Sequence, residues 1–584
     1  MKTHTYSNII FILVLFLNYN HIYSDIPAEC KFSEIKGKWE FYISNKSFDP
    51  NLLNPETACG HSIPNEIEYI IGNKDNYPNN YNKHITLDLS PEHNVIEKGN
   101  IVGDWTPIYL QGFLINYKQS IFNTNFKYFL DEKDEHKFIT DCTKTSLGWY
   151  IPDKNNKHKN WHCFYARKVY AHNSFLKQIS KSLLEIKSNK IVPNKQILFT
   201  TKYDDLANKV KIINEANLTW KAQMNPNFMG KSLYQVKKHL GLNKGVDRIS
   251  DNEYQQYLKN HQNTQILYNQ VNNNNNKDNK INQINSISSI NNIRNNVNIP
   301  ISVLTQIKVK KIKKNEEIDS EFVTNKEDVL KYLNTKIEDI DANKLPRNWD
   351  WRNVGGMNFI PEPREQGDCG SCYTIATIEA IESRLRIKTY NQDQTQFSIN
   401  FPLKCNFYSE GCDGGYPIMV GKFFNEFEII PTNCFKDKCI NKCKNNKKYV
   451  VGKYGYIGKF YPGTNEIDMM KELRARGPIM GSLIVKNDFI HYKSGIYSTK
   501  PLFKNSDYIS NTSLFDDNIE YVKVEHSVLI VGYGEENGVK YWICLNSWGN
   551  SFGEDGFFKI LRGENDSNIE SMAEFITVDV YDNL

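Results

Sequence analysis

The sequence predicts an α+β protein in which a barrel-like antiparallel β domain precedes a mixed helix-and-strand domain. Two stretches rich in aromatic residues, glycine and cysteine flank a polar middle region that contains no cysteine. At 584 residues the chain is also too long for a single hydrophobic core. We divide it into a signal segment (1–24), the β domain (25–169), a linker or propeptide (170–344) and the second domain (345–584).

Alternation of apolar and polar residues predicts the strands of the β domain. Lys38–Ile43 and Ile108–Ile115 alternate in this way, and Gly, Asn and Pro separate such runs from one another. A period of two is typical of strands that bury one face. Periodicity alone leaves a sandwich and a barrel open.

The first residues have the features of a cleaved secretion signal. Lys2 precedes nine apolar residues, Ile9–Leu17, and the small residue Ser24 ends the polar stretch that follows. Nine residues are too few to cross a hydrocarbon layer of about 30 Å as a helix. We therefore expect no membrane partner and a mature chain that enters the secretory pathway with Asp25 at its N-terminus.

Charge and cysteine content indicate which partners and which covalent links to expect. A net charge of +5 is small for this length and gives no reason to expect a nucleic-acid partner. Twelve cysteines in a secreted chain suggest disulfides. Asn-x-Ser/Thr sequences at Asn45, Asn217, Asn511 and Asn565 are candidate glycan acceptors.

The middle region predicts little packed structure. Residues 260–298 are dominated by asparagine, with five in a row at Asn272–Asn276. Such a tract buries too little apolar area to offset its ordering entropy, so we expect disorder there. Residues 212–220 contain enough apolar side chains for one short ordered element.

One cysteine of the second domain is predicted to begin a helix. Ile375, Ile378, Ile381 and Leu385 recur at spacings of three and four, which predicts a helix with one buried face. Cys372 would lie in its first turn. There the helix dipole and the unpaired N–H groups favour thiolate over thiol.

Two further polar residues flank predicted strands. His526 precedes the apolar run Ser527–Val531, and Asn546 follows the run Tyr541–Leu545. A histidine and an asparagine at neighbouring strand ends would be able to meet a helix N-terminus across a cleft. The three groups together supply a thiol nucleophile, an imidazole base and an amide that orients the base.

The blocks that hold these residues resemble the papain family of cysteine peptidases. They are Gln366–Tyr373, Glu525–Ser527 and Asn546–Gly549, in that order along the chain. The resemblance implies a catalytic domain of two subdomains, one helical and one β. His526 lies 154 residues (526 − 372) after Cys372, slightly beyond the usual range of about 130–150, and the polar loop 500–518 accounts for the difference.

The resemblance also assigns roles to the residues. Cys372 would attack the peptide carbonyl, and His526 would protonate the leaving amine. Asn546 would orient the imidazole, with Trp548 shielding that hydrogen bond from water. Gln366 would donate its amide to the oxyanion, alongside the Cys372 backbone N–H.

Each residue taken alone has a more ordinary interpretation. A cysteine is usually half of a disulfide, and a single histidine usually lies in the core or on the surface. Cys369 and Cys372 form a Cys-x-x-Cys pair, which also suggests zinc or a redox pair. We expect no metal, because every cysteine has a better assignment and His526 has only Glu525 nearby at ligand spacing.

The β domain narrows the resemblance to the dipeptidyl peptidase I (cathepsin C) family. Asp25–Cys30, Gly148–Trp149 and Asn160–Phe164 resemble segments of that family's barrel-like exclusion domain, which blocks the cleft beyond the second substrate residue. The family's first residue binds the ammonium group of the substrate through its carboxylate, a role that falls to Asp25. Taken alone, Asp25 would be an ordinary exposed terminal acid.

Further substrate and ion positions follow from the same resemblance. The family holds a chloride ion near its second substrate pocket at positions that match Tyr416, Ile418 and Tyr456. Ile418 replaces a family tyrosine, so one chloride donor is missing, which argues against chloride dependence. Gly414 and Gly415 would let the substrate approach the backbone. Family members form tetramers and are cut into chains, which implies a homotetramer and a second cut in the loop 500–518.

Cysteine pairing is likewise implied by the resemblance. The implied disulfides leave two cysteines unpaired: Cys372, which would be the nucleophile, and Cys544, which would be a buried, inert thiol. The implied disulfides are Cys30–Cys142, Cys59–Cys163, Cys369–Cys412, Cys405–Cys439 and Cys434–Cys443.

The sequence therefore predicts a cysteine exopeptidase that removes dipeptides from peptides and proteins with free N-termini. We expect it to act in a mildly acidic compartment, a lysosome-like vacuole or the secreted space. Two alternatives remain. One is a papain-like endopeptidase whose β domain is an accessory module, and the other is a catalytically silent binding homologue.

Overall fold

The computed structural model describes residues 30–49, 59, 81–131, 134–157, 159–169, 202–216, 218–237, 325–436, 439, 447–460, 463–486, 488–499 and 524–582. Asp25, the asparagine-rich tract 260–298 and the loop 500–518 lie outside these residues. None of the described helices has both the length and the apolar character needed to cross a membrane.

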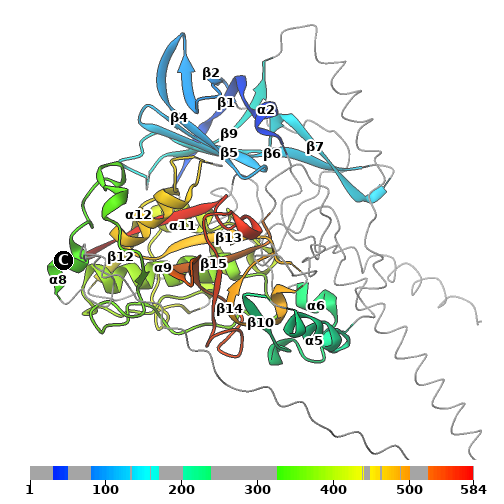
Figure 1. The fold of residues 1–584 in the computed structure, drawn as a ribbon. Helices are drawn as coiled ribbons and strands as arrows, with labels where there is room; N and C mark the ends of the chain where they lie inside the picture. Colours follow the sequence, from blue (N-terminus) through cyan, green and yellow to red (C-terminus); the bar gives the residue numbers. More distant parts are fainter. Residues whose placement is uncertain are drawn as a thin grey trace, which may run out of the picture. The chain divides into compact units, whose positions relative to one another are not determined.

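The first domain is a closed antiparallel β structure, as predicted. Its sheet runs in the order β1-β2-β3-β4-β5-β6-β7-β9-β8, and β1 also pairs with β9, which closes the ring (Figure 1). A short helix precedes the first strand. The elements are α2 Phe32–Ile35, β1 Gly37–Phe48, β2 Lys83–Leu89, β3 Asn94–Glu97, β4 Asn100–Ile108, β5 Gly112–Tyr117, β6 Ser120–Asp131, β7 Asp134–Thr145, β8 Gly148–Ile151 and β9 Trp161–Lys168.

The period-two pattern of the first strand produces the core of this domain. Trp39, Phe41 and Ile43 of β1 are buried, whereas the residues between them are partly exposed. Phe41 packs against Phe113 and Phe122 at ring-centroid distances of 6.1 and 5.1 Å. The alternation found in the sequence is therefore the alternation between barrel interior and surface.

The expectation that Ile108–Ile115 forms one strand is wrong. β4 ends at Ile108, residues 109–111 form a turn, and β5 begins at Gly112. Tyr109 adopts φ +51°, a left-handed conformation that a strand does not accommodate. The alternating pattern concealed the turn because Tyr109 is buried against the second domain and not inside the barrel.

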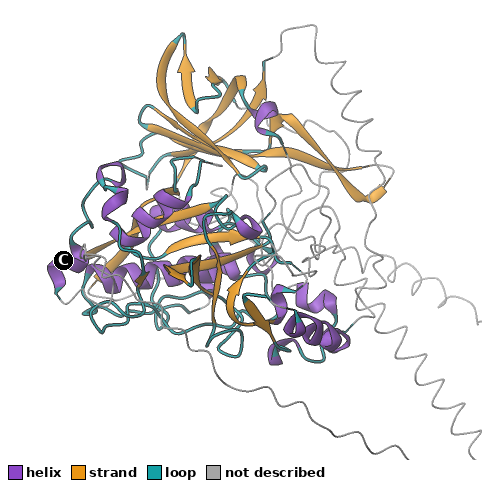
Figure 2. Ribbon diagram, viewed as in Figure 1, coloured by secondary structure: helices purple, strands orange, loops and turns teal. Residues whose placement is uncertain are grey.

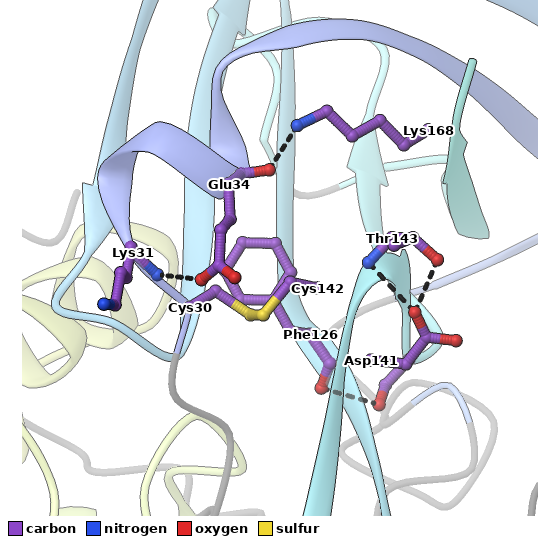
Figure 3. The surroundings of a disulfide bond; sticks show 9 residues. Cys30, Lys31, Glu34, Phe126, Asp141, Cys142, Thr143 and Lys168 are labelled. Atoms are coloured by element: carbon purple, nitrogen blue, oxygen red, sulfur yellow. Dashed lines mark hydrogen bonds between the residues drawn. A yellow bond between two sulfur atoms is a disulfide. The ribbon is translucent and has the colours of Figure 1, made fainter. Parts of the chain in front are cut away.

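Two disulfides tie the β domain together. Cys30–Cys142 links the residue before α2 to β7, and Cys59–Cys163 links a turn to β9. Figure 3 shows the first of these, with Lys168 donating a hydrogen bond to the Glu34 carbonyl close by. The structure also pairs Cys369 with Cys412 and Cys405 with Cys439. Cys434 is disulfide-bonded too, but its expected partner Cys443 lies outside the described residues.

The second domain combines a helical part and a sheet (Figure 2). The sheet order is β10-β14-β17-β16-β15-β13-β18-β12, with β11 paired to β15. The helices are α8 Lys326–Leu330, α9 Cys372–Lys388, α10 Asn400–Cys405, α11 Pro417–Glu426 and α12 Glu466–Arg476. The strands are β11 Trp349–Asp350, β12 Lys447–Tyr456, β13 Ile479–Leu483, β14 Tyr492–Tyr497, β15 His526–Glu536, β16 Val539–Leu545, β17 Phe557–Leu561 and β18 Ala573–Asp582.

Helix α9 has the predicted position, but it is buried on every side and not on one face only. Its polar residues Glu379, Glu382 and Arg384 are as inaccessible as its isoleucines. Arg364 pairs with Glu382 at 2.8 Å and lies 3.7 Å from Glu379. Arg384 pairs with Glu472 at 3.0 Å. These ion pairs allow the polar face to enter the core, because a buried charge needs a partner.

The β domain packs directly on the second domain. Trp149 of β8 meets Phe407 at 5.4 Å, and Trp161 of β9 meets Phe427 at 6.1 Å, between ring centroids. The strands that face this interface are therefore buried on both sides, one toward the barrel interior and one toward the second domain.

The acids of α9 predict that stability falls as the pH rises. Burial raises the pKa of Glu379 to about 8, and the opposing effect of Arg364, which also pairs with Glu382, does not cancel it. The unfolded value is near 4.5, so the contribution of Glu379 is complete below about pH 4.5 and is lost as the pH rises toward 8. The melting temperature, followed by circular dichroism, should be lower at pH 8 than at pH 5. Glu379→Gln should keep the pH 5 value and lose much of this decline; an equal decline in both proteins would contradict the assignment.

Candidate active site

The loop before α9 places Cys372 at the helix N-terminus. The Cys369–Cys412 disulfide holds this loop, and the Gly370 N–H donates to the Cys412 carbonyl at 2.7 Å. Cys372 is the first residue of α9 and is fully buried. The sulfur therefore lies where the helix dipole is most positive, which favours the anionic thiolate.

The sheet meets the helix at this sulfur. The backbone N–H of Ser527 donates to Cys372 Sγ at 3.4 Å. The preceding residue, His526, is the first of β15 and is fully buried. The structure thus brings together the nucleophile and base positions that the motifs predicted, although they lie far apart in the chain.

Asn546 and Trp548 fix the imidazole. His526 Nε2 lies 2.7 Å from Asn546 Oδ1, and Asn546 directly follows β16. The Trp548 ring lies 4.9 Å from the His526 ring and is 1% exposed. With Nε2 bonded to an acceptor, Nδ1 is the ring nitrogen that can exchange a proton with a sulfur or a leaving group.

Gln366 is oriented by Ser547. Its backbone N–H donates to the Ser547 carbonyl at 2.9 Å, and its Oε1 accepts the Ser547 hydroxyl at 2.5 Å. Its Nε2 then donates to the Cys369 carbonyl at 2.8 Å. Because an amide nitrogen carries two hydrogens, the second is able to serve an oxyanion near Cys372.

Gly415 has an internal packing reason in addition to the one predicted. A Cβ at this position would lie 2.6 Å from the ring of Tyr373, the second residue of α9. Gly414 adopts φ +128°, a backbone conformation that favours glycine. The two glycines therefore keep this segment close to the helix that begins with the sulfur.

The three positions expected to bind chloride lie close together. Tyr416 precedes α11, Ile418 lies in its first turn and Tyr456 ends β12, and all three are buried. Tyr109 of the β domain stacks on Tyr416 with centroids 3.6 Å apart and lies 6.3 Å from the Tyr456 ring. The sequence did not identify Tyr109, because it lay inside a run interpreted as a strand.

The structure also contains more of the middle region than the sequence predicted. Residues 202–237 hold η2 Tyr203–Leu206, α5 Ala207–Glu215, β10 Trp220–Ala222, η3 Pro226–Phe228 and α6 Leu233–Lys237. β10 pairs with β14 of the second domain. Aromatic residues such as Tyr203, Trp220 and Phe228, which are buried, were the signal for this packing.

This segment contacts the active site. Asn227 Nδ2 donates to the Trp548 carbonyl at 2.8 Å, and the Phe228 ring meets the Trp548 indole edge-on at 5.3 Å. Lys231 pairs with Asp368 at 2.9 Å, beside the loop that carries Cys372. Residues 225–231 therefore pack on the tryptophan that covers His526.

The remaining cysteine behaves as expected for a structural thiol. Cys544 lies in β16, is fully buried and forms no disulfide. Burial raises its pKa well above the usual value for a thiol. Cys544 is therefore unreactive at neutral pH, in contrast to a thiol at a helix N-terminus.

Comparisons with known proteins agree with this geometry. Residues 345–577 match the papain family cysteine protease model, and residues 25–168 match the cathepsin C exclusion domain. Cathepsin B-like CP2 of Giardia intestinalis is 30% identical over 243 residues, which cover 40% of this chain and 74% of that protein. The chain belongs to the papain family of cysteine peptidases.

Two other relatives of this papain-family chain are named as a dipeptidyl aminopeptidase and as a cathepsin C. Dipeptidyl aminopeptidase 1 of Plasmodium falciparum (isolate 3D7) is 26% identical over 712 aligned positions, covering 97% of this chain and 96% of that protein. Cathepsin C of Schistosoma mansoni is 35% identical over 245 residues, which cover 39% of this chain and 51% of that protein.

From the contacts of residues 225–231 we predict that this segment slows the access of reagents to Cys372. In the full chain, iodoacetamide should alkylate Cys372 faster in a double Asn227→Ala/Phe228→Ala variant than in wild type, because the variant loses two contacts to Trp548. The rate is measured by mass spectrometry of the Cys372 peptide.

Ile212→Ala provides the control for that experiment, since Ile212 lies in the same segment and is 51% exposed. Cys544 should stay unlabelled throughout. A double variant that reacts no faster than the Ile212 control would exclude a role for residues 225–231 in shielding the site.

Proposed function

We propose that this papain-family peptidase is an exopeptidase that releases dipeptides from free N-termini. One observation carries the proposal: the β domain, which matches an exclusion domain, abuts the glycine segment beside the nucleophile. Ile108, Gln111 and Asn125 of the β domain line a pocket together with Gly415 and Tyr416. A wall at that place would limit how much substrate extends past the cleft.

The proposed chemistry follows the positions of the four polar groups. The Cys372 thiolate attacks the carbonyl carbon of the second substrate residue, and the imidazolium of His526 gives its proton to the departing amine. Water then attacks the thioester, with His526 as base, and releases the dipeptide and the thiol. Gln366 and the Cys372 N–H stabilise the oxyanion in both steps, and Asn546 keeps the imidazole oriented.

We assign to the Asp25 carboxylate the role of limiting the substrate to two residues before the cleaved bond. Asp25 lies outside the described residues, but Cys30, five residues later, is fixed where its N–H donates to the Leu110 carbonyl at 2.7 Å. Leu110 follows Tyr109, which stacks on Tyr416. Five residues span at most about 18 Å, so a mature chain that begins at Asp25 would have its N-terminus within about that distance of Cys30. A carboxylate there would pair with the ammonium group of the substrate.

The signal segment expected at residues 1–24 and the disulfides favour action inside the secretory system, in a lysosome-like vacuole or outside the cell. The substrates would be peptides and proteins with accessible N-termini. Mildly acidic surroundings suit the mechanism, because His526 is then readily protonated beside a thiolate.

The oxyanion role of Gln366 is open to a direct test in the mature enzyme. Gln366→Ala should lower kcat/KM by about 10²–10³, the usual cost of losing one oxyanion donor. Alkylation of Cys372 by iodoacetamide forms no oxyanion, so its rate should change little. If both rates fell together, Gln366 would act by positioning the loop and not by stabilising charge.

The exopeptidase assignment is tested with a fluorogenic dipeptide substrate and its N-acetylated form. The free amine should be turned over far faster, because only a charged ammonium group pairs with a carboxylate. Asp25→Asn should remove that preference and keep Cys372 reactive, whereas Glu29→Gln, an acid in the same segment, should preserve it. Equal turnover of both substrates by wild type would instead indicate an endopeptidase.

A further inference from the structure

A buried carboxyl group lies among the positions expected to bind chloride. Glu574 of β18 is 1% exposed, and its Oε1 accepts a hydrogen bond of 2.9 Å from the Tyr109 hydroxyl. The same carboxyl lies near the backbone N–H of Ile418, which favours its charged form. Across the β12–β18 pair, Glu574 lies opposite Tyr456. The carboxyl is thus placed among the very groups that would have to hold an anion.

Tyr109 reaches this carboxyl from the other domain through a strained turn. Its φ of +51° is uncommon for a tyrosine, and such a conformation persists only where the surroundings hold it. Stacking on Tyr416 and the hydrogen bond to Glu574 are the contacts that hold it. The turn between β4 and β5 therefore presents a hydroxyl group to a carboxyl on β18.

A chloride ion would have to share this place with Glu574. The Tyr109 hydroxyl group already donates to the Glu574 carboxyl at 2.9 Å, so it is not available to a bound chloride. When ionised, the carboxyl would also repel a second anion at this distance.

We propose that the Glu574 carboxyl takes the place of the family's chloride, so that this enzyme needs no chloride, and that it holds the β domain to the second domain through Tyr109. The assignment of this place to the second substrate pocket rests on the proposed function. The replacement itself rests on the contacts of Glu574.

Burial raises the pKa of Glu574 to about 8, so the group is mainly protonated in an acidic compartment. A protonated carboxyl still accepts through its carbonyl oxygen and is less costly to bury than a carboxylate. Burial also raises the pKa of Tyr109 well above its usual value, so the hydroxyl group that donates to Glu574 keeps its proton.

The test compares wild-type, Glu574→Ala and Glu574→Gln proteins in chloride and in gluconate at equal ionic strength. Melting temperature is measured first because it needs no substrate, and for wild type it should agree within about 1 °C between the two anions. Glu574→Ala removes the acceptor of the Tyr109 hydroxyl and opens a space beside it, so chloride should raise its melting temperature saturably. Glu574→Gln fills the space with a neutral group of the same size and should not respond.

Activity and diffraction provide two further readouts. Turnover of whichever substrate the enzyme accepts should differ less than about twofold between the anions for wild type, and chloride should restore turnover to Glu574→Ala by about tenfold or more. Crystals soaked in bromide should show an anomalous peak beside Tyr109 in Glu574→Ala and none there in wild type.

A wild-type protein that loses stability or activity without chloride, or that binds bromide at this place, would overturn the proposal. A folded Glu574→Ala protein that ignores chloride would overturn it too. If that variant does not fold, the wild-type measurements decide alone. An endopeptidase would fail the acetylation test and still give these chloride results, so the two proposals fail separately.

Discussion

The active site depends on the contact between the N-terminus of α9 and the start of β15. Cys372 belongs to the helix and His526 to the sheet, and they meet where the Ser527 N–H donates to the Cys372 sulfur. The helix keeps this position because Arg364 and Arg384 pair with the acids on the helix or against it. Ion pairs remote from the sulfur thereby stabilise the helix that carries it, and catalysis depends on precise placement of the reacting groups.

A second contact decides what the β domain adds to this site. Tyr109 packs on Tyr416, next to the glycines that follow the Cys369–Cys412 disulfide. The β domain therefore adjoins the same loop system that carries the nucleophile. The hydrogen bond between His526 and Asn546 involves no residue of the β domain.

Local sequence patterns predicted where Cys372, His526 and Asn546 lie in the fold, whereas they did not predict the interdomain contacts. Cys372, His526 and Asn546 each lie at the end of an element that its own periodicity defines, so their positions followed from the helix and the two strands. Tyr109 and Glu574 are 465 residues apart, and neither belongs to such a pattern. The sequence contained one signal for this contact. An acid between Ala573 and Phe575 in a buried strand needs a hydrogen-bond partner, but the neighbouring residues do not identify that partner.

The acid at position 574 is explained by the donors around it. An apolar side chain there would leave the Tyr109 hydroxyl buried without its acceptor, at a cost of about 1–3 kcal/mol. A carboxyl accepts that hydrogen bond, and its raised pKa lets it do so largely without a buried charge. The Tyr109 hydroxyl and the Glu574 carboxyl are therefore each satisfied only when the other is present. In related chains they should be gained or lost together, with a free anion needed wherever the tyrosine remains and the carboxyl is missing.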